Sequence, residues 1–194
     1  MEIGATKAVQ DRLKTTKIEE SKGASLVFCW DTHLTKIKGR NVLFIVNASN
    51  RYTIAMTDIE PRNWNYYTMY ISRVIHGVMQ EMGYSEDQIG QYFKMSGDTI
   101  VTKTHGRKSV GGINRMVMDA QYFGKKLEKE AKYQWELSEY LNRDICQPEG
   151  FDAYGYPSEL FKLDMERLGI AAKRKPAKII DFTKYIDTNR STNH

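Results

Sequence analysis

The chain has 194 residues, 41% of them hydrophobic, and a formal net charge of +5, so a single core-forming domain with a terminal extension is expected. Its two cysteines, Cys29 and Cys146, form no C-x-x-C motif, which argues against a disulfide scaffold and a thiolate zinc site. The polar start predicts no signal peptide, and no apolar run approaches the roughly 20 residues of a membrane span. A cytoplasmic protein that does not bind membranes is therefore expected.

The first third of the chain predicts mainly strands. Residues 1–7 are expected to form a short strand, 8–13 one or two helical turns, and 15–25 a polar loop. Hydrophobic runs then predict strands at 25–30, around 34–37, at 42–47 and at 51–57, with turns at 39–41 and 48–50. The continuous run 42–47 (VLFIVN) is typical of a strand buried on both faces.

After Pro61 the hydrophobic period changes to that of helices. Apolar residues spaced by three, four and seven from Trp64 to Met82 predict the clearest amphipathic helix. A second helix is expected at 85–93, with Ser85 as its cap. A strand at 98–104, a helix at 110–123 and a helix at 125–142 complete the prediction for this part, with the last two helices continuous or broken at Gly124.

The C-terminal part divides into a loop, a helix and a tail. Residues 147–157 predict a loop whose aromatic residues dock on the body, and 158–168 predict a short helix. Six basic and two acidic residues lie in 171–194, so most of the net charge belongs to this tail. We expect an α+β domain at 1–146, a docked loop and short helix at 147–170, and a flexible basic tail at 171–194. Early strands and late helices favour a mixed or antiparallel sheet with several helices packed on one face.

The segment from Thr104 to Asn114 (THGRKSVGGIN) is the most informative for function. It places glycines, a hydroxyl and two cations at a turn from strand to helix, an arrangement that suits a phosphate at a helix N-terminus. The spacing is not that of a Walker loop. The alternative is an ordinary capped helix in which Ser109 is the cap and the glycines form a tight turn.

The leading hypothesis is therefore a protein that binds a phosphate-bearing ligand, such as a nucleotide or nucleic acid, on a basic concave surface. The predicted phosphate-binding residues are Lys38, Arg40, Arg51, Lys103, Arg107, Lys108 and Ser109, with Asn47 and Asn114 as polar positioning residues. Phosphate contacts release counterions, so such binding would weaken with salt. No cofactor is expected.

An enzymatic alternative rests on Asp31 and His33. Two residues apart on a strand, they point to the same side, and a carboxylate beside an imidazole can orient it for acid–base work. Metal-independent nuclease or phosphodiesterase activity would then use Asp31 and His33 with a nearby arginine. The alternative for this pair is a histidine at a strand end that serves only structure.

The four histidines, His33, His76, His105 and His194, show no spacing typical of metal ligands, so no metal site is predicted.

Aromatic residues at helical spacing are more often core than base-stacking surfaces. If exposed, they favour a third hypothesis, a protein-interaction factor from a phage, plasmid or defence locus. Whether the chain is an enzyme, and its oligomeric state, are left open by the sequence.

The order of several short motifs resembles an uncharacterised family of small bacterial and mobile-element proteins, catalogued as domain of unknown function 6933. The motifs are Thr6-Lys7, Trp30 and His33 beside a strand, Lys38-Gly39-Arg40, the strand Val42 to Asn47, Arg51-Tyr52, and the element Arg107 to Asn114 that opens a helix. The resemblance covers roughly residues 1 to 125 and implies a fold. It implies no activity.

Overall fold

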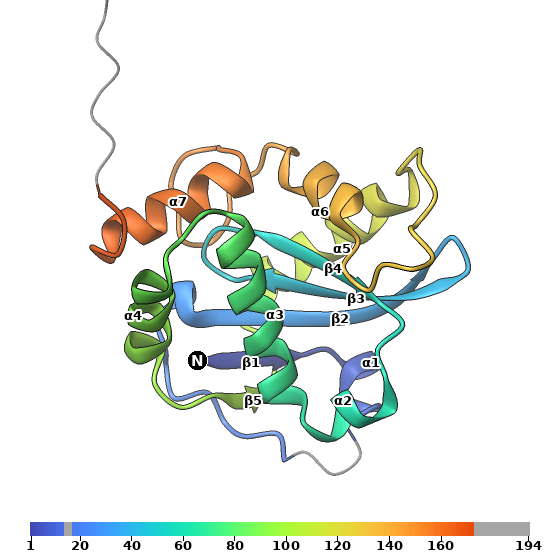
Figure 1. Ribbon diagram of the computed structural model, residues 1–194, viewed down its shortest axis with the longest axis horizontal. Helices are drawn as coiled ribbons and strands as arrows, with labels where there is room; N and C mark the ends of the chain where they lie inside the picture. The colour runs from blue at the N-terminus through green and yellow to red at the C-terminus, as the bar shows by residue number, and fades with distance from the viewer. Residues whose placement is uncertain (14–16, 173–194) are drawn as a thin grey trace, which may run out of the picture.

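The computed structural model describes residues 1–13 and 17–172, so most of the predicted tail at 171–194 lies outside the described residues (Figure 1). Five strands form one sheet in the order β4-β3-β2-β1-β5. They are β1 (Glu2–Ala5), β2 (Cys29–Ile37), β3 (Arg40–Asn47), β4 (Thr53–Thr57) and β5 (Ile100–Thr102). Strand β1 is parallel to both β2 and β5, whereas β2, β3 and β4 form an antiparallel meander. The predicted α+β class with a mixed sheet is confirmed.

Strand β2 corrects the prediction of two short strands at 25–30 and 34–37. A 3-10 turn at Leu26–Phe28 precedes a single strand of nine residues. The polar residues between the two predicted strands remain in β2, because Asp31, Thr32 and His33 pair with β3 without a break in register. Hydrophobicity alone does not distinguish a short buried 3-10 turn from a strand.

Seven helices surround the sheet within the described residues. They are α1 (Lys7–Gln10), α2 (Pro61–Asn65), α3 (Tyr67–Glu81), α4 (Glu86–Ser96), α5 (Gly106–Gln121), α6 (Trp135–Asn142) and α7 (Pro157–Arg167). Ser85 forms the expected capping box at the start of α4, where its hydroxyl accepts from Gln88 N and the Gln88 side chain accepts from Ser85 N. None of the described helices combines the length and apolarity of a membrane span.

The predicted helix at 125–142 is wrong in its first half, because residues 122–134 form an irregular segment and the helix begins at Trp135. Gln134 is buried and organises this segment. Its Nε2 donates to the carbonyls of Glu128 and Ala131, and its Oε1 accepts from Glu128 N. One buried amide thus satisfies backbone groups that a helix would have paired internally.

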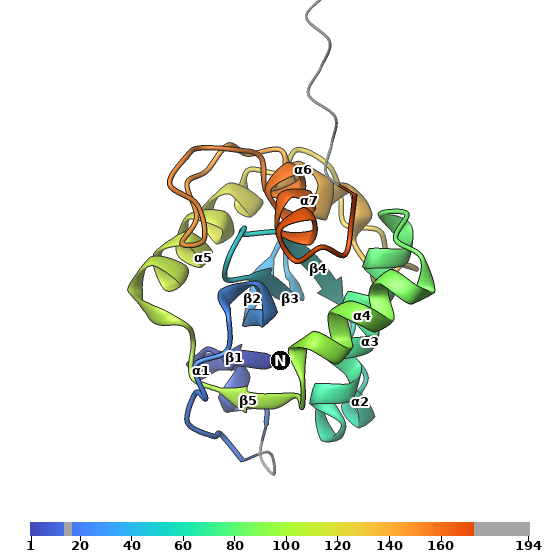
Figure 2. The same ribbon diagram turned by 90° about the vertical axis from the view of Figure 1, so that its left-hand side faces the viewer.

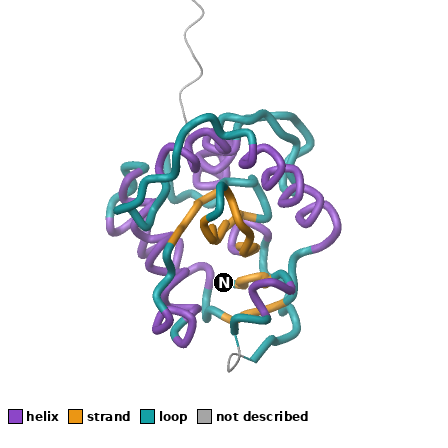
Figure 3. The backbone as a smooth tube through the Cα atoms, turned by 90° about the vertical axis from the view of Figure 1, so that its right-hand side faces the viewer, coloured by secondary structure: helices purple, strands orange, loops and turns teal. Residues whose placement is uncertain are grey.

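Helices cover both faces of the sheet, which corrects the expectation of one covered face (Figures 2 and 3). Strand residues alternate, so Leu43 and Ile45 join the core cluster that contains residues of α1, α3, α4 and α7. Phe44 and Val46 join a second cluster with residues of α5 and α6. The strand at 42–47 is therefore buried on both faces, as its continuous hydrophobic run predicted.

Candidate functional site

A cluster of polar side chains lies under the N-terminus of α5, where β2, β1 and β5 are neighbours. The parallel register pairs Glu2 with Cys29 and Gly4 with Asp31, so the side chains of Glu2, Cys29 and Asp31 share one face of the sheet. Strand β5 leads through a short turn into α5, with His105 at the N-cap position. We call Glu2, Cys29, Asp31, His105 and Ser109 the polar cluster.

Asp31 is fully buried and is the acceptor at the centre of this cluster. Its Oδ1 lies 2.7 Å from His105 Nδ1, and its carboxylate also accepts from the His105 backbone N–H, at 3.2 and 3.3 Å. The Ser109 hydroxyl donates to Asp31 Oδ2. The N-terminus of α5 therefore already faces an anion, the Asp31 carboxylate, and the helix dipole stabilises that charge.

Glu2 lies on the other side of the same imidazole. His105 Nε2 is 3.1 Å from Glu2 Oε2, and the carboxylate also accepts from Ser21 Oγ and Lys22 N, each at 2.7 Å, and from Ala24 N at 3.3 Å. Burial by itself would raise the pKa of Glu2, but these hydrogen bonds to its charged form outweigh burial and lower that pKa.

His105 is held between two carboxylates. Burial by itself would lower the pKa of His105, but the hydrogen bonds to Asp31 and Cys29 and the charge of Asp31 raise it to about 10. Both ring nitrogens therefore carry protons at neutral pH, and each faces a carboxylate oxygen. This imidazolium links β1, β2 and the start of α5.

Gly4 provides the space for the Asp31–His105 pair. A Cβ atom at this position would lie 1.8 Å from Asp31 Oδ1 and 3.0 Å from His105 Nδ1. Any side chain at position 4 would therefore displace the carboxylate or the ring. Gly4 permits the Asp31 carboxylate and the His105 ring to lie close to the backbone of β1.

The arrangement does not resemble a serine nucleophile with its base. Ser109 donates to Asp31 and not to the imidazole, whereas nucleophile activation requires the hydroxyl to donate to the base. The cluster also has metal-binding groups. Glu2, Cys29 and His105 each offer one ligand atom, and these atoms lie within 4.8 Å of one another.

The predicted catalytic pair is separated by its hydrogen bonds. Asp31 interacts with His105 and Ser109, whereas His33 Nδ1 lies 3.2 Å from Thr6 Oγ1. Burial lowers the pKa of His33. Asp31 thus orients a histidine 74 residues away in the chain rather than the one two residues away.

Two of the predicted phosphate-binding residues, Lys38 and Arg40, lie at the hairpin between β2 and β3 and hold the 122–134 segment. Lys38 Nζ donates to the Lys125 carbonyl at 2.9 Å. Arg40 donates to the Glu128 carbonyl at 2.7 Å and forms an ion pair with Asp58. Their donors are therefore engaged within the protein, away from the start of α5.

Four other predicted residues, Asn47, Arg51, Lys108 and Ser109, line one small cavity together with Pro148 and Glu149. Asn47 shapes the turn after β3, since its Oδ1 accepts from Ser49 N and Asn50 N. Lys108 Nζ donates to the Pro148 carbonyl at 3.2 Å. The remaining three, Lys103, Arg107 and Asn114, are exposed along the start of α5.

Arg51 adopts the left-handed conformation, with φ of 63°, and its guanidinium lies against Gly112 of α5. A Cβ at Gly112 would come within 2.6 to 2.8 Å of three guanidinium atoms. Gly112 therefore gives the Arg51 guanidinium room to lie against α5, and a larger residue there would push that flexible side chain aside. This is a packing role that the sequence did not predict for the Gly111-Gly112 pair.

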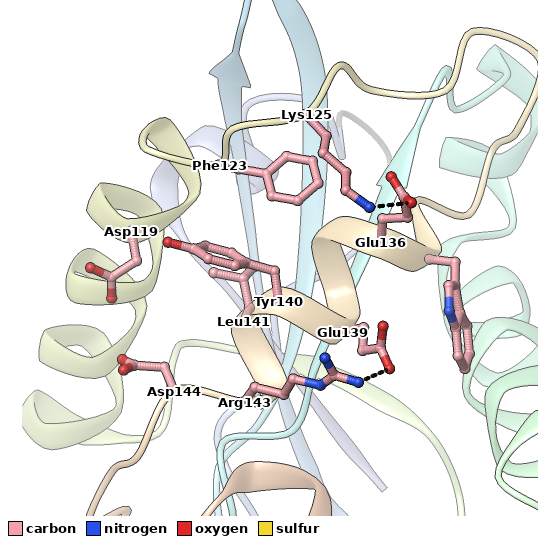
Figure 4. A pocket seen from close by; sticks show the side chains of 10 residues that line it. Asp119, Phe123, Lys125, Glu136, Glu139, Tyr140, Leu141, Arg143 and Asp144 are labelled. Carbon is pink, nitrogen blue, oxygen red and sulfur yellow. Dashed lines mark hydrogen bonds and ion pairs between the residues drawn. The ribbon is translucent and has the colours of Figure 1, made fainter.

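A larger cavity of about 460 Å³ lies between α5 and α6 (Figure 4). Two ion pairs, Lys125–Glu136 at 2.6 Å and Arg143–Glu139 at 2.7 Å, lie along it beside the ring of Tyr140. A neighbouring cavity of about 320 Å³ shares Trp135, Glu139 and Arg143 with the first. Trp135 and Tyr140 remain 44% and 43% exposed.

No pattern in the sequence indicates that Glu2, Cys29 and His105 form one site. They lie 27 and 76 positions apart along the chain, and no motif spacing connects them. The one sequence feature that these three residues share is that each lies in, or directly after, a predicted strand. Only the pairing of β1 with both β2 and β5 makes those strands neighbours.

A protein-family model matches residues 2–160 of the chain, and its family is described as Domain of unknown function (DUF6933). The matched range contains the whole polar cluster. A search of curated proteins and a search of solved structures each returned no match.

Proposed function

The chain belongs to the DUF6933 family, a domain of unknown function, and we propose that it binds a phosphate-bearing ligand, a nucleotide or nucleic acid, at the start of α5. Four cations carry this proposal: Arg51, Lys103, Arg107 and Lys108. Within residues 1–13 and 17–172 none of the four forms a salt bridge, and Lys103, Arg107 and Lys108 are exposed. Lys108 Nζ donates to the Pro148 carbonyl, but its charge has no carboxylate partner there. Cations that lie near one helix end without a carboxylate partner favour an anionic ligand.

The proposed phosphate contacts differ from the sequence-based expectation of a phosphate bound at the N-terminus of the helix. The His105 amide already donates to Asp31, and the Gly106 amide donates to the Thr104 carbonyl at 3.0 Å. Asp31 also places a negative charge where a phosphate bound by the helix end would lie. The proposed contacts are therefore made by cationic side chains, and we expect the affinity to fall steeply with salt.

The test compares Arg107→Ala with Arg115→Ala, a change of an exposed arginine further along the same helix that is paired with Asp119. Both variants and wild type are titrated with nucleotides and with short RNA and DNA. A charge-assisted contact contributes about 1.5–3 kcal/mol, so Arg107→Ala should bind at least about tenfold more weakly at low salt. The difference should shrink at high salt, and Arg115→Ala should bind like wild type.

Thermal melts complete this experiment, because an exposed arginine contributes little to stability and both variants should melt close to wild type. If wild type binds no member of the panel, the proposal fails. Equal losses for the two arginine variants would mean that net charge, and not this surface, determines binding.

A second candidate function, docking of a protein partner, is favoured by the cavity between α5 and α6. Its specific observation is the partial exposure of Trp135, which lines both neighbouring cavities. Half-exposed aromatic residues beside a cavity are typical anchors of protein interfaces. Fluorescence of Trp135 would report peptide binding, and the signal should disappear in Trp135→Phe and persist at high salt. The nuclease alternative gains no such support, and we propose no reaction.

A further inference from the structure

We propose that Glu2, Cys29 and His105 bind a divalent transition-metal ion of the zinc class, with Asp31 holding the histidine ligand in place. This inference is independent of the proposed ligand surface, because it concerns the buried cluster and not the exposed cations. It departs from the sequence-based expectation of no metal site, which considered only spacing along the chain.

The donor set is the first argument. A carboxylate oxygen, a thiol sulfur and an imidazole nitrogen lie within 4.8 Å of one another, and Glu2 Oε2 is 3.1 Å from His105 Nε2. Tetrahedral zinc holds its ligands at about 2.0–2.3 Å, which separates them by roughly 3.3–3.8 Å. The ligand atoms therefore need to move only by tenths of an ångström up to about an ångström to surround an ion.

The groups around the ligands are the second argument. His105 presents Nε2 to the proposed site while its Nδ1 faces Asp31 at 2.7 Å. A carboxylate behind a histidine ligand fixes the ring and its tautomer, and this is the usual outer shell of protein zinc sites. Glu2 is oriented in the same way by Ser21 Oγ, Lys22 N and Ala24 N.

The environment of Cys29 is the third argument. Cys146, the other free cysteine, packs in an apolar cluster with Phe151 and Leu160. Cys29 is also fully buried, but it belongs to none of the three apolar clusters and lies beside Glu2 and His105. Apolar packing thus accounts for Cys146, whereas Cys29 lies beside two ionisable groups, with its Sγ also 3.6 and 3.5 Å from the carbonyls of Ala24 and Ser25.

The proposed site would connect three elements of the fold. Glu2 belongs to β1, Cys29 to β2, and His105 lies at the start of α5, so an ion bound by all three residues would join these elements. Three protein ligands leave the fourth position of a tetrahedral zinc ion to a water molecule or another ligand.

The experiment uses the full chain, stripped with a chelator under reducing conditions and then given one equivalent of zinc or cobalt. After gel filtration we expect about one bound zinc per chain in wild type and in Cys146→Ser, the matched control. Cys29→Ser should bind at least tenfold more weakly and should lose the absorption band that cobalt shows when a thiolate binds it. Asp31→Asn, which keeps all three ligands, should weaken binding by about 10–100-fold.

Circular dichroism of each variant shows whether it folds. If Cys29→Ser does not fold, X-ray absorption at the zinc edge of the wild-type protein still tests the site. One sulfur at about 2.3 Å together with nitrogen and oxygen ligands is expected. The proposal is overturned if wild type retains no zinc, if the zinc shell contains no sulfur, or if the cobalt band depends on Cys146.

Discussion

The two faces of the sheet are buried by different chemistry. On one face, Ile3, Leu43 and Ile45 pack against α3, α4 and α7 in a large apolar cluster. On the other, an apolar region formed by β3 and β4 under α5 and α6 adjoins the polar cluster on β1 and β2. Glu2, Cys29 and Asp31 are as deeply buried as residues of the apolar core, with at most 2% of each exposed. Burial therefore does not distinguish core from candidate site in this fold, whereas the partners of the buried groups do.

Two buried carboxylates illustrate the difference. Glu2, in the polar cluster, has four hydrogen-bond donors, and these lower its pKa despite burial. Asp164 of α7 accepts from Asn50 Nδ2 at 2.9 Å and lies 3.3 Å from an Arg167 nitrogen, yet burial outweighs these contacts and raises its pKa. The hydrogen-bond donors around Glu2 thus stabilise its charged form, whereas the surroundings of Asp164 favour its protonated form.

The largest expected effect comes from the apolar face. Ile75 is fully buried in α3, so Ile75→Ala should lower the free energy of unfolding by about 2–5 kcal/mol. Met69 of the same helix is 44% exposed, and Met69→Ala should change the free energy of unfolding by less than about 0.5 kcal/mol. Chemical denaturation measures both. A loss below about 0.5 kcal/mol for Ile75→Ala would contradict the packing of α3 on the sheet.

An intermediate effect is expected at Gly4, on the polar face. Gly4→Ala places a methyl group 1.8 Å from Asp31 Oδ1 and should cost about 1–3 kcal/mol in unfolding free energy. Gly90 of α4 has no atom within 4 Å of its virtual Cβ, so Gly90→Ala should stabilise the protein by up to about 1 kcal/mol. The two glycine variants should thus shift stability in opposite directions. A stabilising Gly4→Ala would show that the polar cluster is looser than described.

The smallest expected effect concerns Asp164 and depends on pH. Because the pKa of this group is raised from its usual 3.8 in the folded state, the folded protein holds the proton more tightly. As the pH rises from about 4 towards 7, ionisation therefore costs the folded state stability. Asp164→Asn cannot ionise, so its stability relative to wild type should increase over this range. Denaturation at several pH values measures the difference, with Asp152→Asn, at an exposed position, as the control. A difference that falls with pH would reverse the assigned direction.

Much of the fold was determined by local sequence. The apolar spacing of α3, the capping box at Ser85 and the continuous hydrophobic run of β3 each specify an element through contacts within a few residues. The family resemblance also rested on short local motifs and their order along the chain, and the family-model match over residues 2–160 confirmed it. The helix predicted at 125–142 failed where a distant contact intervened. Gln134 and Arg40 bind the carbonyl of Glu128 and hold the segment in an irregular form.

The composition of the candidate site was decided only by the tertiary structure. The sequence predicted roles for Asp31 and for the turn before α5, and it paired Asp31 with His33, the nearest histidine in the chain. Parallel pairing of β1 with β2 and β5 instead brings Glu2, Cys29 and His105 to Asp31. Such pairing joins segments that are far apart in the sequence, and no local propensity or spacing encodes which strands become neighbours.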